Sequence, residues 1–394
     1  MNPSIPVSHF MLPDSRQWQR RALVAGLVLL VISIIGAFFN RAEFFRSYLM
    51  SYLFWFGLTL GSMALVMVQY LTGGAWGVVT RRTLEAAMLT LPVLAFLFIP
   101  ILIGMPDLYP WWNQNTVAHD EVLRHRHVYM NAPLFILRAV VYFAIWMVFA
   151  YFLNRWSRRE DEIGDQSRKL AMLSAPGLIL YVFTVTFSSI DWAESLESHW
   201  FSTIWGFIFV VSQGLTAMSF AIVAMAAFSR KPPLDSVLNP RHFLDLGKLL
   251  LMFVMLWGYM AYSQLLIVWS GNLTTEIPWY LPRFGTSWGW IGAALIVFQF
   301  IVPFLLLLSR PLKQNATTLV VVVGILVVMR FVDLFWIVMP DFYTSGFTIH
   351  WLNFTLPIAI GGIWLASFLW QLSRRPLLPL GAANLEQAVR HGQE

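Results

Sequence analysis

Residues 317–339 read TTLVVVVGILVVMRFVDLFWIVM, and this stretch decides the fold class. A helix needs about 20 mainly apolar residues to cross the hydrocarbon core of a membrane, and this run has that length. Ten such runs, bounded by charges or by Pro, Gly and Asn, occur in the 394 residues. We therefore predict an all-α integral membrane protein, a single polytopic domain over residues 1–394. The predicted spans are residues 22–39, 47–71, 84–104, 133–153, 169–189, 203–228, 243–270, 287–308, 317–339 and 349–371.

The composition agrees with this class. Only 12% of the residues are charged and 58% are hydrophobic, whereas a soluble domain carries about 25% charged residues. The chain has no cysteine, which excludes thiolate chemistry, iron–sulfur ligation, covalent haem attachment and disulfides. Any redox role must therefore use other groups, and we expect no cofactor to be bound directly.

The basic residues predict the topology. If the loops alternate across the ten spans, 18 Lys and Arg residues fall on the side of the N-terminus and five on the opposite side. Basic loops stay in the cytoplasm, so this split places both termini there. The net charge of +6 is thereby explained by topology, and no nucleic-acid partner is expected.

Ionisable residues inside the spans are the main functional candidates. Each costs roughly 2.5–3.5 kcal/mol at the centre of a lipid-exposed helix, so we expect them to face the bundle interior and to be paired. Asp245 and Lys248 are spaced i,i+3 on one helical face, and a second such pair lies near residue 330. The six residues are Glu85, Arg138, Asp245, Lys248, Arg330 and Asp333.

The seventh span carries polar residues at both ends of one face. At about 100° per residue, Asp245, Lys248, Tyr259, Tyr262 and Ser263 share an arc about 100° wide. Ten apolar residues, about 15 Å of helix, separate the two groups, so this helix alone cannot form a proton wire. The polar residues of other spans near the right depth are Ser212, Gln213 and Gln299.

A second polar zone lies toward the external side. Arg330 and Asp333 occupy the external half of the ninth span, Arg138 enters the fourth span from that side, and His350 and Asn353 open the tenth. Two zones of charge on opposite sides favour proton half-channels, for which intramembrane acids and lysines are the expected parts. The alternative interpretation is that each pair is a static salt bridge that only fixes the packing of the helices.

Other kinds of site are weakly supported. Only His350 among the eight histidines touches a predicted span, so a bis-histidine haem is excluded by ligand supply. The loop histidines His119, His125 and His127 could bind a metal ion, but loop histidines beside arginines are more often solvated. No nucleotide-binding loop, dinucleotide fingerprint or serine-hydrolase motif occurs.

Two external loops are rich in aromatic residues. Residues 105–132 contain Trp111 and Trp112, and residues 271–286 contain the run Pro278-Trp-Tyr-Leu-Pro282. Such aromatics are typical of headgroup anchors, and a docking surface for an extramembrane partner is the alternative.

The seventh span and the loop after it, residues 243–280, carry distinctive motifs. These are Asp245-Leu-Gly-Lys248, Tyr262-Ser-Gln264, Trp269-Ser-Gly-Asn272 and Glu276-Ile-Pro-Trp-Tyr280. In these motifs and in its ten spans, the chain resembles the F subunit of alternative complex III, a bacterial quinol:electron-acceptor oxidoreductase. More distantly, it resembles the membrane subunit of polysulfide reductase.

The resemblance implies two four-helix bundles flanked by further helices, in a complex of the bacterial inner membrane that oxidises menaquinol or another quinol. The implied partners are a sister polysulfide-reductase-like membrane subunit, an iron–sulfur subunit, c-type haem subunits, a terminal oxidase and membrane lipids. The F subunit is expected to hold no redox centre, and to contribute structure and proton translocation. The candidate pathway residues are Asp245, Lys248, Tyr259, Tyr262, Ser263, Gln264, Arg330, Asp333, Arg138, Glu85 and His350.

Two other functions remain open at this point. A secondary transporter also has about ten spans with polar groups at the midplane, and it would need broken helices. Prolines at positions 92, 100, 176, 303 and 357 make kinks feasible, although no two interrupted spans occupy matching positions in the two halves. A pure membrane scaffold, in which the charges only tie helices together, is the third interpretation.

Overall fold

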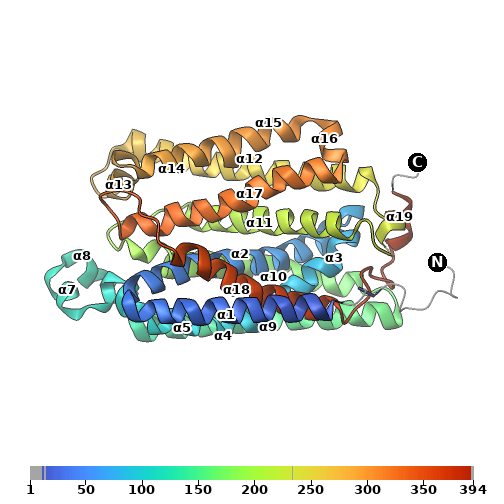
Figure 1. Ribbon diagram of the computed structural model, residues 1–394, viewed down its shortest axis with the longest axis horizontal. Helices are drawn as coiled ribbons and strands as arrows, with labels where there is room; N and C mark the ends of the chain where they lie inside the picture. Colours follow the sequence, from blue (N-terminus) through green and yellow to red (C-terminus); the bar gives the residue numbers. More distant parts are fainter. Residues whose placement is uncertain (1–10, 13–14, 233, 392–394) are drawn as a thin grey trace.

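The computed structural model describes residues 11–12, 15–232 and 234–391. In this part of the chain, ten helical segments are long and apolar enough to cross a membrane, and each coincides with a predicted span. They run side by side along the long axis of the molecule (Figure 1). The prediction of an all-helical, multi-pass membrane protein is confirmed, and the only β-structure described is one bridge between Met11 and Pro376.

The unbroken spanning helices are α1 (Arg16–Phe39), α2 (Arg41–Thr72), α9 (Ala132–Ile163), α10 (Ser167–Trp192), α11 (Trp205–Phe228), α12 (Pro240–Gly271), α17 (Ala316–Val338) and α18 (Leu352–Leu372). The broken third span consists of α3 (Ala75–Met88), α4 (Leu91–Phe96) and α5 (Ile99–Ile103). The eighth span consists of α14 (Trp288–Leu295), η6 (Ile296–Ile301) and α15 (Val302–Leu308). The connecting helices are α6 (Met105–Leu108), η2 (Pro110–Trp112), α7 (Gln114–His119), α8 (Glu121–Arg126), η3 (Glu194–Leu196), η4 (Leu234–Ser236), η5 (Ile277–Trp279), α13 (Tyr280–Gly285), α16 (Arg310–Gln314), η7 (Met339–Asp341) and α19 (Leu385–Arg390).

Several helices extend beyond the predicted apolar runs. Helix α2 begins at Arg41 rather than at residue 47, α3 begins at Ala75 rather than at 84, and α9 continues to Ile163 rather than to 153. Hydropathy marks the part that lipid can cover, whereas a helix continues for as long as its polar groups find partners within the protein. The added turns therefore bring charged residues into the packed helical array.

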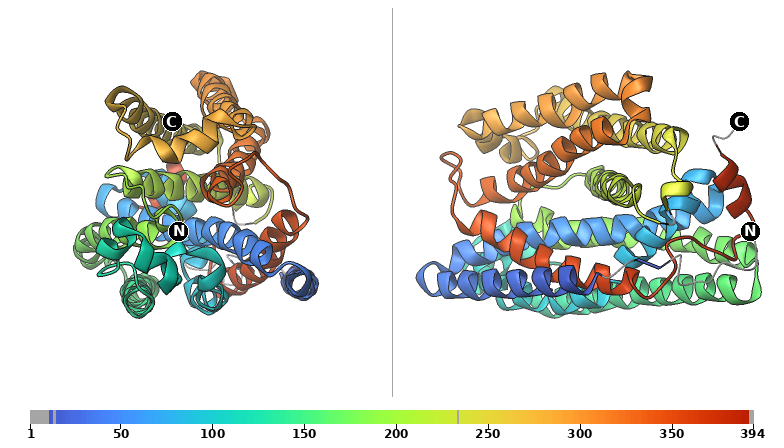
Figure 2. Two further views of the ribbon diagram at one scale, coloured as in Figure 1. Left: turned by 90° about the vertical axis from the view of Figure 1, so that its left-hand side faces the viewer. Right: turned by 45° about the vertical axis from the view of Figure 1, so that its right-hand side comes forward.

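Helix α2 occupies the centre of the molecule and α1 its edge. In α2, 89% of the most apolar stretch is buried, against 17% in α1. Helix α2 contacts α3, α10, α11, α17 and α18, whereas α1 packs mainly on α18. Figure 2 shows α1 at the periphery beside α18. Most polar residues of α2, including Ser47, Ser51 and Thr59, are consequently buried.

Glycine allows α2 and α11 to approach each other closely. A Cβ atom on Gly61 would lie 2.1 Å from the backbone oxygen of Gln213 in α11, a separation that no side chain can adopt. Glycines also allow α1 and α18 to pack closely, because a Cβ on Gly362 would lie 2.7 Å from the Cα of Gly26. Small residues at such positions are the usual means of close helix packing in membranes.

The third span is broken twice, and two tyrosines of α2 donate to carbonyl oxygens at the second break. After Pro92 and before Pro100 the amide donors shift to nearer carbonyls, which leaves the oxygens of Leu94 and Leu97 without helical partners. Tyr52 donates to the Leu94 oxygen at 3.2 Å, and Tyr48 donates to the Leu97 oxygen at 2.7 Å. Irregular backbone at membrane depth persists only where the protein supplies such partners.

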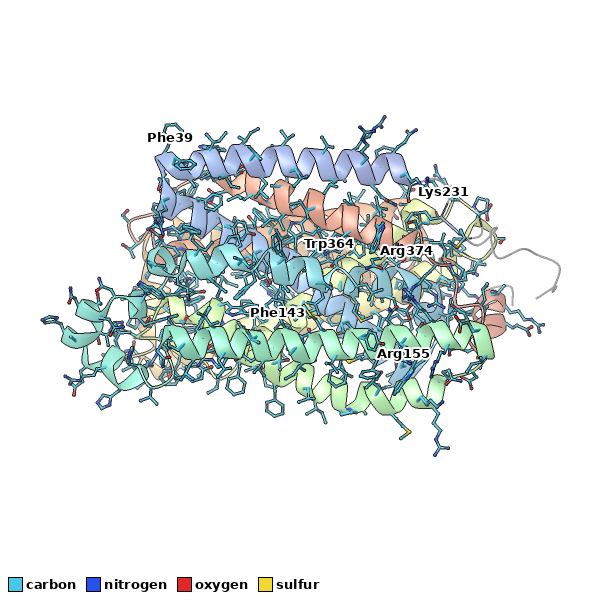
Figure 3. All side chains as sticks on the ribbon, turned by 90° about the horizontal axis from the view of Figure 1, so that it is seen from below. Phe39, Phe143, Arg155, Lys231, Trp364 and Arg374 are labelled. Atoms are coloured by element: carbon cyan, nitrogen blue, oxygen red, sulfur yellow. The ribbon has the colours of Figure 1, made fainter. Side chains whose placement is uncertain are left out.

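Both ends of the described chain lie at one end of the helical array. Helix α1 begins where α19 lies (Figure 1). Figure 3 shows Arg155, Lys231 and Arg374 toward this end and Phe39 toward the other. We call it the basic end, and the end near Phe39 the opposite end.

The substitution Gly61→Ala tests the close approach of α2 and α11. Because the added methyl group meets the Gln213 backbone, we expect a loss of about 1–3 kcal/mol, the usual cost of overpacking. It should appear as a lower melting temperature by tryptophan fluorescence in detergent. Gly324→Ala in α17 is the control, because nothing lies within 4 Å of its added Cβ. Equal melting temperatures for the two variants would contradict the account.

Candidate functional site

Glu85 lies at the centre of a buried cluster of charged residues at the basic end. Its carboxylate, 1% exposed, accepts a hydrogen bond from Ser157 Oγ at 2.6 Å and pairs with Arg82 at 2.7 Å. Arg375, beyond the end of α18, reaches the same carboxylate at 3.3 Å, and the hydroxyl of Tyr70 donates to it at 3.2 Å. The site thus joins α2, α3, α9 and the C-terminal segment.

Two further acids complete this Glu85 cluster. Arg81 pairs with Glu160 at 2.6 Å, and Arg82 also pairs with Asp161 of α9. Three arginines therefore face three acids, and the cluster is neutral overall. Burial lowers the pKa of Arg375 to about 10, while the charge of Glu85 opposes that shift.

Burial of these arginines corrects the sequence analysis, which counted Arg81, Arg82 and Arg375 among the basic residues of the loops. The three side chains are at most 8% exposed. The reason for Arg81 and Arg82 is that α3 begins at Ala75, so both lie inside the helix. The prediction of only six ionisable residues in the spans was accordingly too low.

Glu43 is a buried carboxyl group at the opposite end of α2. It is 1% exposed, and its hydrogen-bond partners are all neutral. Tyr343 donates to it at 2.6 Å, Ser47 at 3.1 Å and the amide of Asn353 at 3.2 Å. His350, a predicted pathway residue, makes no bond to Glu43; its backbone amide holds Asn353 in place at 2.7 Å. The sequence analysis missed Glu43 because it precedes the predicted span.

Arg138 finds its partner in α10. Its guanidinium makes two hydrogen bonds with Asp191, at 2.8 and 2.9 Å, and Tyr142 donates to the same carboxylate at 3.0 Å. The ring of Tyr129 lies 3.8 Å from the guanidinium carbon. The expectation that Arg138 is paired is confirmed, whereas Asp191 escaped notice because it lies beyond the predicted end of its span.

A line of polar residues runs along α2 between Glu43 and the Glu85 cluster, and we call it the α2 seam. Its further members are Ser47, Ser51, Thr59 and Ser62, all buried. Thr59 shares a hydrogen bond of 2.9 Å with Thr90 of the broken third span, and Trp364 of α18 donates to Thr59 at 2.8 Å.

Eight residues separate Ser62 from Tyr70 of the Glu85 cluster, and an equally long interval in the α2 seam lies between Ser51 and Thr59. The eight residues correspond to about 12 Å of helix. Gln213 of α11 lies beside this interval, since a Cβ on Gly57 would be 3.4 Å from its Cγ atom. Tyr181 of α10 donates to the Gln213 side chain at 2.7 Å. Polar groups of α10 and α11 therefore meet beside this interval of α2.

The polar face of α12 points outward instead. Asp245 and Lys248 pair at 2.9 Å as expected, but their side chains are 31% and 58% exposed. Tyr259 and Tyr262 are 68% and 63% exposed, and Ser263 is half-buried. The expectation that the Asp245–Lys248 pair faces the bundle interior is wrong, because helical spacing groups residues on one face without showing which way that face points.

Arg330 and Asp333 form a buried ion pair within α17. Both are 4% exposed, and Arg330 donates to Asp333. Beside them Gln299 donates to the Met329 backbone oxygen at 2.9 Å and accepts from Trp257 at 3.1 Å, with its amide oriented to satisfy both. Gln299 sits in η6, a π-helical turn of a type often found at functional positions.

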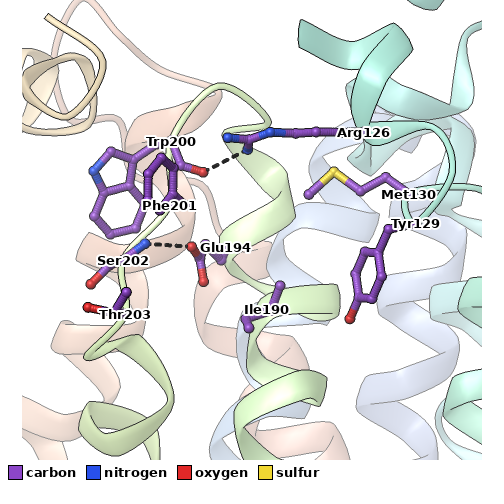
Figure 4. Close-up of a pocket in the computed structure, with 9 residues that line it drawn as sticks. All are labelled: Arg126, Tyr129, Met130, Ile190, Glu194, Trp200, Phe201, Ser202 and Thr203. Carbon is purple, nitrogen blue, oxygen red and sulfur yellow. Dashed lines mark hydrogen bonds between the residues drawn. The ribbon is translucent and has the colours of Figure 1, made fainter.

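Gln264 belongs to a different polar group near the opposite end. It donates to the Tyr280 hydroxyl at 3.1 Å and accepts from Ser202 Oγ at 2.9 Å. The Ser202 backbone amide donates to Glu194 at 2.8 Å, beside a mainly apolar pocket of about 360 Å³ (Figure 4). Burial raises the pKa of Tyr280 to about 12, against the effects of Gln264 and a nearby arginine.

The two aromatic-rich loops pack onto the protein. Trp111 and Trp279 are 2% and 3% exposed, and Trp279 stacks on Trp200 at 4.7 Å, so these two rings are not free anchors. Arg283 is fully buried, and burial lowers its pKa. It pairs with Asp341 at 2.8 Å. Among the described residues, no three His, Asp or Glu side chains are grouped to hold a metal ion.

The comparisons add no family assignment. No protein-family model matches the chain, and no curated protein matches it. Its function is therefore inferred from the residues and their geometry.

The substitution Asp191→Asn tests the pair with Arg138. It leaves the guanidinium without its charged partner, so we expect a loss of about 1–3 kcal/mol and a lower melting temperature. Asp165→Asn is the matched control, because it removes one negative charge at an exposed turn held only by Ser167. If the two variants melted alike, the pair would have no structural importance.

Proposed function

We propose that this chain is a non-redox membrane subunit of a quinol:electron-acceptor oxidoreductase similar to alternative complex III, and that it conducts protons. The motifs of the seventh span and the following loop support membership of such a complex. The absence of cysteine supports electron transfer through neighbouring subunits. The observation that carries proton conduction is the α2 seam, which runs between buried carboxyl groups near both ends of one central helix.

Glu43 and Glu85 are suited to exchange protons in different ways. Glu43 accepts hydrogen bonds from two hydroxyl groups and an amide, and in this proposal it is the carboxyl group that exchanges protons at its end of α2. Glu85 faces two arginines, so a proton leaving it leaves a stabilised carboxylate. In this proposal the hydroxyl groups between them, with water in the intervals, relay the proton.

In the proposed two-bundle arrangement, α2, α3–α5, α9 and α10 form one bundle, α11, α12, α14–α15 and α17 form the other, and α1 and α18 flank the first. Helix α11 packs on α2 and α10 as well as on α12 and α17, so it joins the two bundles. We further propose that the basic end faces the cytoplasm of a bacterial inner membrane, because basic residues gather there. The Glu43 end then faces the external side and the partner subunits that carry haem and iron–sulfur centres.

Two alternatives are less well supported. A secondary transporter would use interrupted helices in equivalent halves, but the two interrupted spans are second in one helix group and third in the other. If the chain were only a scaffold, the Glu85 cluster and the Arg138–Asp191 pair would hold the helices together and take no part in proton transfer. Substrate uptake by the isolated chain in liposomes would favour the transporter.

Purification from the native membrane tests membership of a complex. We expect haem-bearing and iron–sulfur subunits to co-purify with the chain, together with quinol oxidation by the preparation. Recovery of the chain alone under mild detergent conditions, with no redox-active partner, would contradict this part of the proposal.

The number of protons translocated per quinol oxidised tests the α2 seam. Glu43→Gln keeps the volume and most hydrogen bonds but removes the exchangeable proton, so we expect the ratio to fall while quinol oxidation in uncoupled membranes continues. Ser51→Ala removes a single hydroxyl group from the α2 seam and should also lower the number of protons translocated per quinol.

Lys248→Met is the matched control, because it removes an exposed charge outside the seam. A fall for Lys248→Met and none for the seam variants would move the pathway to α12. Unchanged ratios in every variant, including one with Arg330 and Asp333 neutralised, would support the scaffold.

A further inference from the structure

A groove at the basic end lies where α1, α4 and α18 meet. Its volume is about 430 Å³. Leu23 of α1, Val93 of α4 and Ile363 and Ala366 of α18 form its apolar part, whereas Arg20 and Trp370 lie nearer the helix ends. The groove therefore has a charged mouth and an apolar interior.

The mouth of the groove is positively charged. Arg16 and Arg20 line it, and no acidic residue in the described part of the chain does. The guanidinium of Arg374 lies 3.8 Å from the ring of Trp370, which brings a third basic group to the rim. Gln19, which also lines the groove, is held to α18 by hydrogen bonds of 3.3 Å to the Leu369 oxygen and to Ser373.

The groove runs from the end of the helices into the membrane. Leu23 lies three residues beyond Arg20, and Ile363 lies seven residues before Trp370, which is about 10 Å along α18. Helix α1 has few other neighbours, and its remaining surface is exposed. An occupant of this groove would contact the basic residues and the apolar wall at the same time.

We propose that the groove binds one anionic phospholipid, such as phosphatidylglycerol or cardiolipin. Its phosphate lies against Arg20 and Arg374, and one acyl chain follows Leu23, Val93 and Ile363 into the membrane. Basic pockets between transmembrane helices on the positively charged side suit such headgroups. The apolar wall requires a lipid rather than a free phosphate ion, and the excess of positive charge favours an anionic lipid over a zwitterionic one. This inference does not depend on the proposed function.

Native mass spectrometry of the full chain in detergent tests the site. We expect one phosphatidylglycerol molecule to be retained under conditions that remove phosphatidylcholine, and inorganic phosphate not to displace it. Arg20→Gln should weaken retention about fivefold, the factor contributed by one basic residue near an anionic surface. Ser367→Trp, which fills the groove and keeps every charge, should abolish retention.

Arg21→Gln is the matched control. It removes the same charge from the same turn of α1, but Arg21 points about 100° away around the helix and lies over Trp18 instead. We expect it to leave lipid retention unchanged. Equal losses for Arg20→Gln and Arg21→Gln would mean that only diffuse charge attracts lipid, and equal retention of phosphatidylcholine would remove the anionic preference. Either result would overturn the proposal, as would retention by Ser367→Trp.

Discussion

Most of helix α2 is enclosed by other helices, so its buried polar groups depend on partners inside the protein. Lipid offers these groups no hydrogen-bond partner at membrane depth, and an unpaired one costs several kcal/mol. The rest of the structure supplies the partners: Thr90 and Trp364 meet Thr59, and the backbone oxygens of the broken third span accept from Tyr48 and Tyr52. The close contact of α2 with α11 and the breaks in the third span follow from this central position.

The same constraint explains why the charged residues gather near the ends of the helices. The Glu85 cluster forms where α3, α9 and the C-terminal segment converge, and opposite charges compensate one another there. Glu43 differs, because the groups that donate hydrogen bonds to it are two hydroxyl groups and an amide. The proposed proton movement rests on this difference between the carboxyl groups near the two ends of α2.

The sequence predicted the ten helices because a long apolar run is a strong signal for a membrane span. It also identified Arg330 and Asp333 as a buried pair, since two opposite charges at helical spacing within such a run have few other uses. The sequence did not predict that the face of α12 with Asp245, Lys248 and Tyr262 is exposed, because helical periodicity shows which residues share a face but not what that face contacts. It also missed Glu43 and Asp191, which lie in helical turns beyond the apolar runs and whose partners are distant in sequence.

The protonation of Glu43 during quinol turnover is the most direct test of the central claim that the α2 seam carries protons. Infrared difference spectroscopy of the intact complex resolves the carboxyl C=O stretch of a single group that gains or loses a proton. The account predicts a carboxyl band that appears on turnover, shifts in deuterated water and is missing from Glu43→Gln. A difference spectrum that is the same for the wild type and Glu43→Gln would show that Glu43 keeps one protonation state, and would contradict the account.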